Sequence, residues 1–352
     1  MSDISQDLQQ QVSQAVTSQS PLSILGSGSK QFLFKHDEQN QLHVNAHTGV
    51  INYEPTELVL TARAGTTLSE IEALLQQHQQ MLGFEPPRFS DSATLGGTIA
   101  CNLSGPRRPF AGAARDFTLG CHILNGHSDI LHFGGEVMKN VAGYDVSRLM
   151  AGAFGTLGVL LDISIRVLPL PETEMTVSLE CNRQEAIQTC IALRQKAIPV
   201  SAACHVDQQL FVRFSGNAMA VKQAVQQTGG DILQKAASFW HSIREQQHDF
   251  FLSQKPLWRI SVPPASSIPE LKDHSLLDWG GGLYWFFTNK PAEQVKAIAC
   301  KTGGHATLFR NSNDEKHPFA ALDPLMLKLQ KRLKQAFDPA CIFNPDLFNK
   351  SL

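Results

Sequence analysis

The chain has 352 residues, of which 42% are hydrophobic and 18% charged, and its formal net charge is −2. This length and composition describe a globular protein large enough for two domains, each with its own core. The charge balance gives no electrostatic reason to expect nucleic acid or an anionic membrane surface as a partner. No apolar run approaches the length of a membrane span.

The seven cysteines are odd in number and contain no CxxC pair. This usage is typical of buried thiols in a reducing compartment. It also excludes an iron–sulfur cluster held by this chain alone, because such clusters need closely grouped cysteines. The polar N-terminus lacks the apolar core of a signal peptide. We therefore expect a cytoplasmic protein.

The first part of the chain alternates between helical and strand patterns. The polar N-terminal residues predict a short amphipathic helix, and residues 21–25 predict a strand that ends at residues 26–30. Residues 58–64 alternate like a strand, and Thr67 with Glu70 forms a capping box that begins a helix.

The run Gly26-Ser27-Gly28-Ser29-Lys30 has two interpretations. It is either a flexible link or a nest of backbone N–H groups that can hold a diphosphate. It is not the Rossmann fingerprint, because GxGxxG needs a glycine where Gln31 stands.

A glycine-rich stretch runs from Asp91 to Pro171. Glycine at this density predicts tight turns, or a backbone that closely approaches another molecule. Residues 95–100 and 154–160 place small residues directly before an apolar run, a layout that exposes backbone N–H groups to a phosphate oxygen. The alternative is a loop-rich β domain whose turns need positive φ.

The composition changes after Pro171, which marks the best domain boundary. The β-α-β-β-α order beyond it predicts an antiparallel sheet with helices on one face. In the last helix we expect Leu322, Leu325, Met326, Leu329 and Leu333 to face inward. The expected strands lie near residues 176–180, 200–205, 210–214, 258–262, 283–287 and 305–309, and the helices near 183–196, 218–227, 292–300 and 321–337.

Two segments carry a resemblance: ATLGGTIACNLSGPRRPFAGAARDFTLG and VMKNVAGYDVSRLMAGAFGTLGVLLDISIRVLP. They resemble the flavin domain of the vanillyl-alcohol oxidase and p-cresol methylhydroxylase superfamily. Within it, the chain is similar to the FAD-binding subunits of bacterial glycolate oxidases (glycolate dehydrogenases), from about Leu22 to Pro345. The resemblance implies an α+β protein with a two-part FAD-binding domain and an α+β cap domain built on an antiparallel sheet.

The implied domains are residues 1–170 for FAD, 171–336 for the cap, and a C-terminal segment, 337–352, that returns to the FAD domain. The pyrophosphate loops would lie near residues 26–30 and 94–98. Covalent members carry a flavin-linking histidine in or near the first loop, where this chain has Ser29. We therefore expect non-covalent FAD.

The resemblance also implies individual FAD contacts. Lys139 and Asn140 either position a flavin edge or only fix their loop. The implied cofactor-binding residues are Gly26, Ser27, Gly28, Ser29, Lys30, Thr94, Leu95, Gly96, Gly97, Thr98, Asn102, Gly155, Thr156, Gly158, Val159 and Asn344.

The implied function is oxidation of glycolate to glyoxylate, with electrons passing through flavin to an iron–sulfur partner. Such chemistry needs a base for the hydroxyl proton and a cation for the carboxylate. Arg259 and His305 are the catalytic candidates in the second domain. A stacking or salt-bridge role is the alternative for Arg259, and a structural role for His305.

The chain lacks the HxGDGNxH and EHGxG motifs of the catalytic partner and of related dehydrogenases, so we expect no metal site. The favoured interpretation is a subunit that works with a catalytic flavoprotein and an iron–sulfur protein, and reaches the inner membrane only through that complex. The alternatives are a self-sufficient FAD-dependent dehydrogenase of another small hydroxy acid or alcohol, and a non-catalytic assembly subunit.

Overall fold

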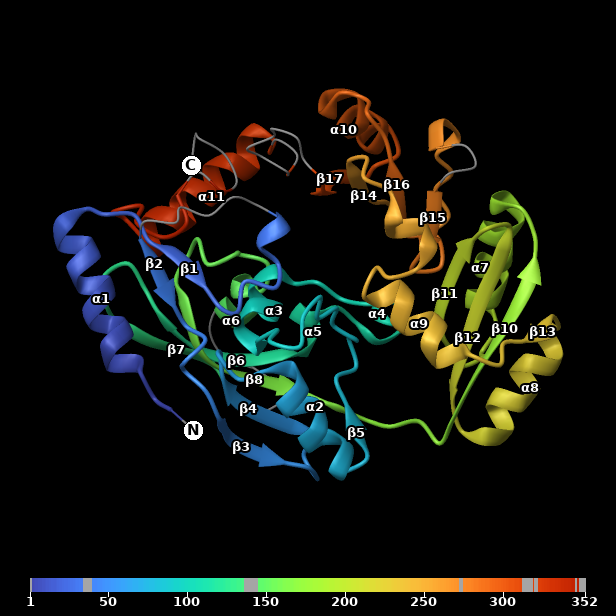
Figure 1. Cartoon of the computed structure of the whole chain (residues 1–352), viewed down its shortest axis with the longest axis horizontal. Coiled ribbons are helices and arrows are strands. Elements are labelled where there is room, and N and C mark those ends of the chain that lie inside the picture. The colour runs from blue at the N-terminus through green and yellow to red at the C-terminus, as the bar shows by residue number, and fades with distance from the viewer. Residues whose placement is uncertain are drawn as a thin grey trace. The chain divides into compact units, whose positions relative to one another are not determined.

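The computed structural model describes residues 2–33, 40–135, 145–271, 275–311, 319, 322–345 and 347. The chain forms two compact units (Figure 1). Unit 1 comprises Met1–Leu103, Ala113–Pro169 and Ala321–Leu352, and unit 2 comprises Ser104–Gly112 and Leu170–Ala320. The domain boundaries expected at residues 170 and 336 stay a prediction.

Unit 1 is built on a five-stranded antiparallel sheet. Its middle strands are rich in Val, Ile and Leu and are buried along most of their length, so they form the core. The strand order is β3 (Val50–Glu54), β4 (Val59–Arg63), β8 (Val159–Arg166), β6 (Thr118–Leu124) and β7 (Ile130–Gly134).

Short helices and a strand pair complete the first unit. Helix α2 begins at the predicted cap, where the Thr67 hydroxyl accepts a hydrogen bond from the Glu70 N–H at 3.2 Å. The helices are α1 (Ser5–Ser18), α2 (Leu68–Gln77), α3 (Leu95–Cys101), α5 (Ala114–Phe117), α6 (Val146–Met150) and α11 (Pro324–Phe337), and β5 (Gln80–Met81) pairs with β9 (Leu168–Pro169).

A second, two-stranded parallel sheet pairs β1 (Ser23–Leu25) with β2 (Gln41–His43). Strand β1 confirms the strand predicted over residues 21–25, and it leads directly into the glycine–serine loop. The C-terminal segment lies along the same strand, because the Leu22 N–H donates to the Ile342 carbonyl at 2.7 Å.

The C-terminal segment is fastened by a buried ion pair. The ammonium of Lys334 lies 2.7 Å from the carboxylate of Asp338, which is fully buried. The same ammonium donates to the carbonyls of Thr156 and Phe343 at 2.8 and 2.9 Å. Asp338 in turn accepts from the N–H groups of Ile342 and Phe343. Each charge is therefore paired and hydrogen-bonded, as buried charges must be.

Helix α11 corrects the prediction about its leucines. Leu325, Met326 and Leu329 are exposed, and Leu322 just before the helix is exposed as well, whereas Leu333 is half-buried. The side chain of α11 that is buried is Lys334. The leucine-rich face of α11 is therefore not the face that packs on the rest of unit 1.

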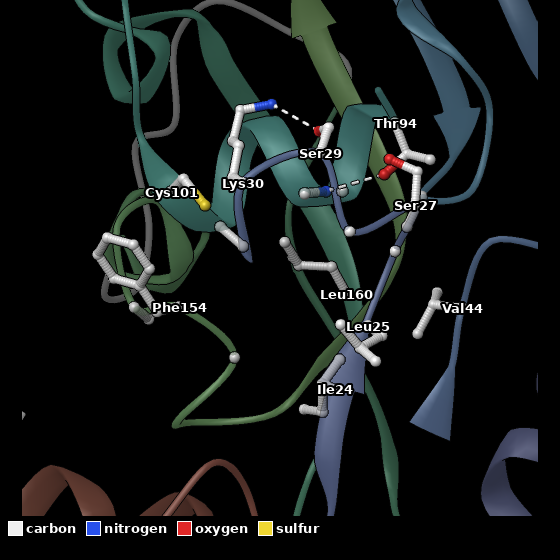
Figure 2. Close-up of a pocket in the computed structure, with 18 of the residues that line it drawn as sticks. Ile24, Leu25, Ser27, Ser29, Lys30, Val44, Thr94, Cys101, Phe154 and Leu160 are labelled. Carbon is white, nitrogen blue, oxygen red and sulfur yellow. Dashed lines mark hydrogen bonds between the residues drawn. The ribbon is translucent and has the colours of Figure 1, made fainter. Parts of the chain in front are cut away.

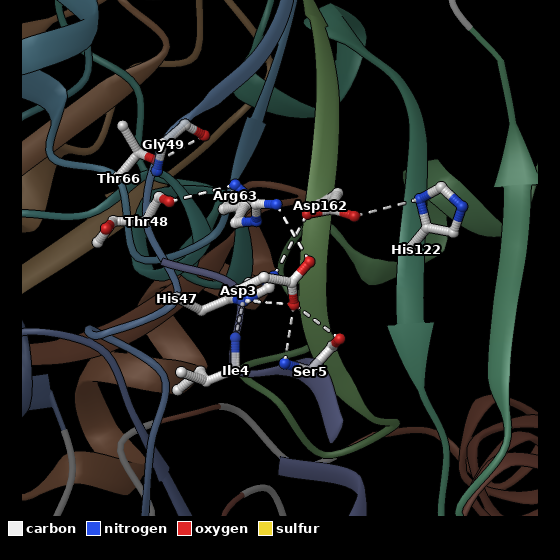
Figure 3. A network of polar contacts seen from close by, with 10 residues as sticks. All are labelled: Asp3, Ile4, Ser5, His47, Thr48, Gly49, Arg63, Thr66, His122 and Asp162. Atoms are coloured by element: carbon white, nitrogen blue, oxygen red, sulfur yellow. Dashed lines mark hydrogen bonds and ion pairs between the residues drawn. The ribbon is translucent and has the colours of Figure 1, made fainter. Parts of the chain in front are cut away.

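The N-terminus is fixed by a polar network (Figure 3). The Ile4 N–H donates to Nδ1 of the buried His47 at 3.2 Å, while Nε2 lies 3.3 Å from Asp162 on β8. Asp3 pairs with Arg63 on β4 at 3.1 Å. Hydrogen bonds to Ser5, together with Arg63, lower the pKa of Asp3 to about 2.

Unit 2 is built on an eight-stranded antiparallel sheet. Every strand expected after residue 171 is present, and α7 (Arg183–Gln195) begins at the predicted cap, Asn182 with Glu185. The strand order is β13 (Asp231–Ile232), β10 (Thr173–Glu180), β12 (Gln209–Gly216), β11 (Val200–Val206), β15 (Ser275–Asp278), β16 (Leu283–Phe287), β14 (Leu257–Ser261) and β17 (His305–Arg310).

Helices pack on both faces of this sheet, whereas the sequence predicted one. Val212 on β12 shares a core with α7 and α8 (Ala218–Thr228). Its neighbour Phe211 points to the other face and its ring lies 4.1 Å from that of Phe239 on α9 (Ala236–Arg244). The aromatic side chains of α9 thus cover the second face. The remaining helices of unit 2 are α4 (Arg108–Ala111) and α10 (Ala292–Lys301).

Within the part of the chain that the structure describes, no helix is both long enough and apolar enough to cross a membrane.

Candidate cofactor site

A pocket in unit 1 brings together the three glycine segments (Figure 2). It is walled by the loop after β1, by α3 and by the segment that leads into β8. The empty space within it is about 830 Å³, a figure that includes the part open to solvent. Figure 2 shows Ser27, Ser29 and Thr94 towards one end, and Leu25 and Leu160 towards the other.

The first wall is a row of backbone donors. The N–H groups of Gly26, Ser27, Gly28 and Ser29 donate to no group in the residues that the structure describes. Gly28 has φ +76°, a left-handed conformation that other residues rarely adopt. Successive N–H groups around such a residue form a nest that attracts anions. This wall therefore has the donors that a diphosphate needs.

The second wall is a helix, and its N–H groups are already engaged. Leu95 donates to Thr66 at 2.9 Å, Gly96 to Ala64 at 2.8 Å, and Thr98 to the Thr94 carbonyl at 3.0 Å. The Gly97 N–H donates to the Thr94 hydroxyl at 3.2 Å (Figure 2). The sequence predicted that residues 94–98 would offer N–H donors to a phosphate. The N–H groups of residues 95–98 already have protein acceptors, and the phosphate loop at 94–98 stays a prediction.

The two glycines of this helix have different roles. A Cβ on Gly96 would lie 2.6 Å from the Ala64 side chain, so this glycine lets α3 pack closely on the chain beside β4. Among the described residues, a Cβ on Gly97 would meet only the Thr94 hydroxyl, at 3.2 Å. Because Gly97 also lines the pocket, its missing side chain leaves room for a ligand.

The third wall is fixed by hydrogen bonds to the side chain of Asn344. Its amide donates to the Phe154 carbonyl at 2.6 Å, and its side-chain oxygen accepts from the Ile24 N–H at 2.9 Å. Phe154 and Ile24 both line the pocket, so Asn344 joins two of its walls. Gly155 beside it has φ +71°, and a Cβ there would lie 2.9 Å from the Asn344 amide.

Ten of the sixteen residues predicted to bind the cofactor line this pocket, and six do not. The latter lie in supporting positions. Asn102, for example, ends α3 with φ 49° and accepts from the Arg115 N–H at 3.1 Å. Lys139 and Asn140 lie outside the described residues. The six are Leu95, Thr98, Asn102, Thr156, Val159 and Asn344.

Lys30 is the one charged side chain among the described residues that line the pocket. Its ammonium lies 3.4 Å from the Ser29 hydroxyl and 6.0 Å from the centre of the Phe89 ring. Burial raises the pKa of the Cys101 thiol to about 11, although Lys30 acts in the opposite direction. Cys101 is therefore a neutral thiol at neutral pH and not a nucleophile.

The sequence missed the apolar part of the pocket. Ile24, Leu25, Ala64, Met150 and Leu160 all line it. Each belongs to, or directly adjoins, a strand or helix that reads as ordinary core, so nothing in the local pattern separates these residues from packing residues.

Arg259 and His305 lie together in unit 2. Arg259 on β14 pairs with Thr307 on β17, and His305 lies two residues along that strand, on the same face. The Arg259 guanidinium lies 5.0 Å from the centre of the Trp279 ring and 6.0 Å from that of Trp285. Burial first, and then the two nearby guanidinium groups, lower the pKa of His305. The ring is therefore neutral at neutral pH.

The family of FAD binding domains matches residues 4–134, which contain the first loop and α3. Over 343 residues the chain is 45% identical to glycolate oxidase subunit GlcE of Escherichia coli (strain K12), covering 97% of both chains. The chain belongs to the GlcE family. The predicted resemblance and the predicted FAD-binding domain are thereby confirmed.

This GlcE-family chain also matches parts of longer proteins. It is 33% identical over 165 residues to glycolate oxidase subunit GlcD of Bacillus subtilis (strain 168), which is 46% of this chain and 32% of that one. The alkyldihydroxyacetonephosphate synthase structure superposes with a TM-score of 0.67 at 15% identity, over 97% of this chain and 74% of that one. At this identity the match shows the fold, and the predicted α+β fold class is confirmed.

Proposed function

We propose that this chain is the FAD-binding subunit of a complex that oxidises glycolate to glyoxylate. The observation that supports it is the row of backbone donors from Gly26 to Ser29, which have no acceptor in the described residues. These donors belong to the matched FAD binding domain and border a pocket. The membership of the GlcE family supports the substrate.

The pocket suits FAD in three ways. The N–H groups of residues 26–29 would hold the diphosphate, and the ammonium of Lys30 would add a positive charge nearby. The bare Cα of Gly97 leaves room for the ligand, and the apolar residues around Leu25 and Leu160 exclude water. Bound FAD would supply an acceptor for the electron pair that leaves the hydroxy acid. With Ser29 in the first loop in place of a linking histidine, the cofactor would be held without a covalent bond.

The side chains that bind the substrate would come from unit 2. Arg259 would fix the carboxylate of the hydroxy acid, and the neutral ring of His305 would accept the hydroxyl proton. A neutral imidazole is the form that a general base needs.

The electron path would continue outside this chain. Its cysteines are free and scattered, so an iron–sulfur cluster would have to be carried by another subunit, beside a catalytic flavoprotein. The names of the matched relatives, GlcE and GlcD, are those of glycolate oxidase subunits, which supports an assembly of several chains.

The decisive experiment is an absorption spectrum of the purified chain, before and after glycolate is added, alone and with its partners. We expect a flavin spectrum that glycolate bleaches weakly in the isolated chain and fully in the complex. Full bleaching of the isolated chain would instead show a self-sufficient dehydrogenase. A colourless protein that still assembles would show a non-catalytic subunit.

A matched pair of variants tests the residues. Arg259→Ala and His305→Ala should lower the turnover of the assembled complex more than they lower its assembly. If both assemble normally and turn over glycolate at the wild-type rate, unit 2 takes no part in the chemistry.

A further inference from the structure

The exposed apolar side chains of this protein gather at the start of α11. Among the described residues, ten large apolar side chains are exposed, and four of them lie within residues 322–329. These four, Leu322, Leu325, Met326 and Leu329, form the leucine-rich face, and Leu325 is 67% exposed. The three on the helix are spaced three and four residues apart, so they share one side of it. Single exposed apolar residues are ordinary, whereas a cluster of this kind marks a contact surface.

The helix that carries the leucine-rich face is complete without a partner. The carboxylate of Asp323 caps its first turn and accepts from the N–H groups of Leu325 and Met326 at 2.9 and 3.0 Å. Its last turn is anchored in unit 1 by the buried ion pair of Lys334 and Asp338. Because both ends of the helix are fixed, a partner that binds this face loses little affinity to ordering it.

Cations border the leucine-rich face. Lys328 and Arg332 lie three residues beyond Leu325 and Leu329, and are therefore their neighbours on the helix surface. Lys328, Lys331 and Arg332 are exposed and form no ion pair with a residue that the structure describes. Helix α11 contains no acidic residue. A surface of this kind complements an apolar groove that is bordered by carboxylates.

The charges disfavour two other occupants. A second copy of the chain would bring the same cations into a symmetric contact, where α11 offers no acidic residue to pair with them. A bilayer also fits poorly, because the leucine-rich face is short and has no tryptophan or phenylalanine. The net charge of the chain, −2, gives it no attraction to anionic lipid headgroups. A protein partner with an acidic border fits best.

We propose that the leucine-rich face is the docking site for the GlcD-family subunit of the same oxidase. The proposal rests on the proposed function for the existence of the complex. GlcD is the second glycolate oxidase subunit among the matched relatives, and therefore the partner to which the proposal commits. Helix α11 enters an apolar groove of that subunit with Leu325 and Leu329 as anchors, while Lys328, Lys331 and Arg332 face carboxylates at the border of the groove.

Binding of the purified full-length chain to the GlcD-family subunit of the same organism is measured by biolayer interferometry. Leu325→Ala combined with Leu329→Ala should weaken binding at least tenfold, because a few anchors dominate the affinity of such contacts. Met219→Ala on α8 is the matched control, since Met219 is 78% exposed and belongs to unit 2. Thermal unfolding checks that each variant is folded. Unchanged affinity in the double variant, or no binding by the wild type, would refute the docking site.

A second pair of variants tests the charged border. Lys328→Glu combined with Arg332→Glu should slow association at least tenfold at low salt, and added salt should slow association of the wild type. Lys222→Glu, at an exposed position of α8, is the control and should associate as the wild type does. A charge-reversed chain that associates at the wild-type rate would overturn the match to an acidic border.

Two measurements test the other occupants. A wild-type dimer in analytical ultracentrifugation that is lost in the Leu325 and Leu329 double variant would assign the face to a second copy. Binding to phosphatidylglycerol vesicles that is lost in the same variant, while the GlcD-family subunit still binds, would assign it to a membrane. Either result would overturn the proposal.

The docking test is independent of the chemistry. A complex that assembles through the leucine-rich face but whose flavin is never reduced by glycolate would overturn the proposed oxidation and leave the docking site standing. A complex that oxidises glycolate and contains the double variant at wild-type affinity would do the reverse.

Discussion

The substitution Gly97→Val tests the pocket most directly. A Cβ at this position meets only the Thr94 hydroxyl, at 3.2 Å, and otherwise faces the open pocket. The two methyl groups of valine would therefore occupy space that we assign to FAD. The helix itself should tolerate the change, because valine costs a helix no more than glycine does. We expect the free energy of unfolding of the flavin-free chain to change by less than about 0.5 kcal/mol.

Gly97→Val should lower the thermal stability of the chain, relative to the wild type, only when FAD is present. A ligand at 100 times its dissociation constant stabilises the folded state by about 2.7 kcal/mol. For a domain of 150–250 residues this corresponds to a rise in Tm of roughly 5–10 °C. Thermal unfolding with and without FAD should show that rise in the wild type and none in Gly97→Val.

The control is Gly135→Val. Among the residues that the structure describes, a Cβ on Gly135 meets no atom within 4 Å, and Gly135 is not one of the described residues that line the pocket. This variant should keep the FAD-dependent rise in Tm. A folded Gly97→Val protein that retains one FAD per chain would refute the assignment of the pocket.

Three further predictions concern the flavin linkage, the C-terminal ion pair and the histidine. Acid precipitation should release FAD into the supernatant, and flavin that remains on the denatured chain would contradict non-covalent binding. Lys334→Met leaves Asp338 buried without its cation, so urea unfolding should show a loss of about 3–5 kcal/mol; the exposed Lys331→Met on the same helix should lose little. Burial first, and then the nearby cations, lower the pKa of His305 below 6.5, so its ring stays neutral in the folded chain while the unfolded chain takes up a proton. Stability should therefore fall as the pH drops through about 6.5. NMR titration should show the pKa of His305 rise in Arg259→Met, and an unchanged pKa would contradict the coupling.

Local signals predicted most of the fold. The capping pair of Asn182 and Glu185 begins α7 as expected, because both partners of that motif lie within one turn of helix. Helix α11 shows where such reasoning stops. Its leucine spacing indicated a buried stripe, but the buried side chain is Lys334, whose partners Thr156 and Phe343 lie in other parts of the chain. Helical periodicity contains no information about a distant carbonyl group.

The candidate site also has features that the sequence predicts and features that it does not. The donors of the glycine–serine loop could be predicted, because glycine and serine after a strand favour an exposed backbone. The acceptors of the first N–H groups of α3, on Thr66 and Ala64, could not be predicted, because no short motif encodes those contacts.

The hydrogen bond between Ile24 and Asn344 spans 320 positions of the sequence. Strand β1 begins the pocket, yet one of its flanking partners, the segment from Ile342 to Asn344, is synthesised much later. The backbone of the wall that contains Ile24 therefore stays incompletely paired until residues 342–344 have been synthesised. A nascent chain that stalls before residue 342 would therefore lack one side of the pocket wall that contains Ile24.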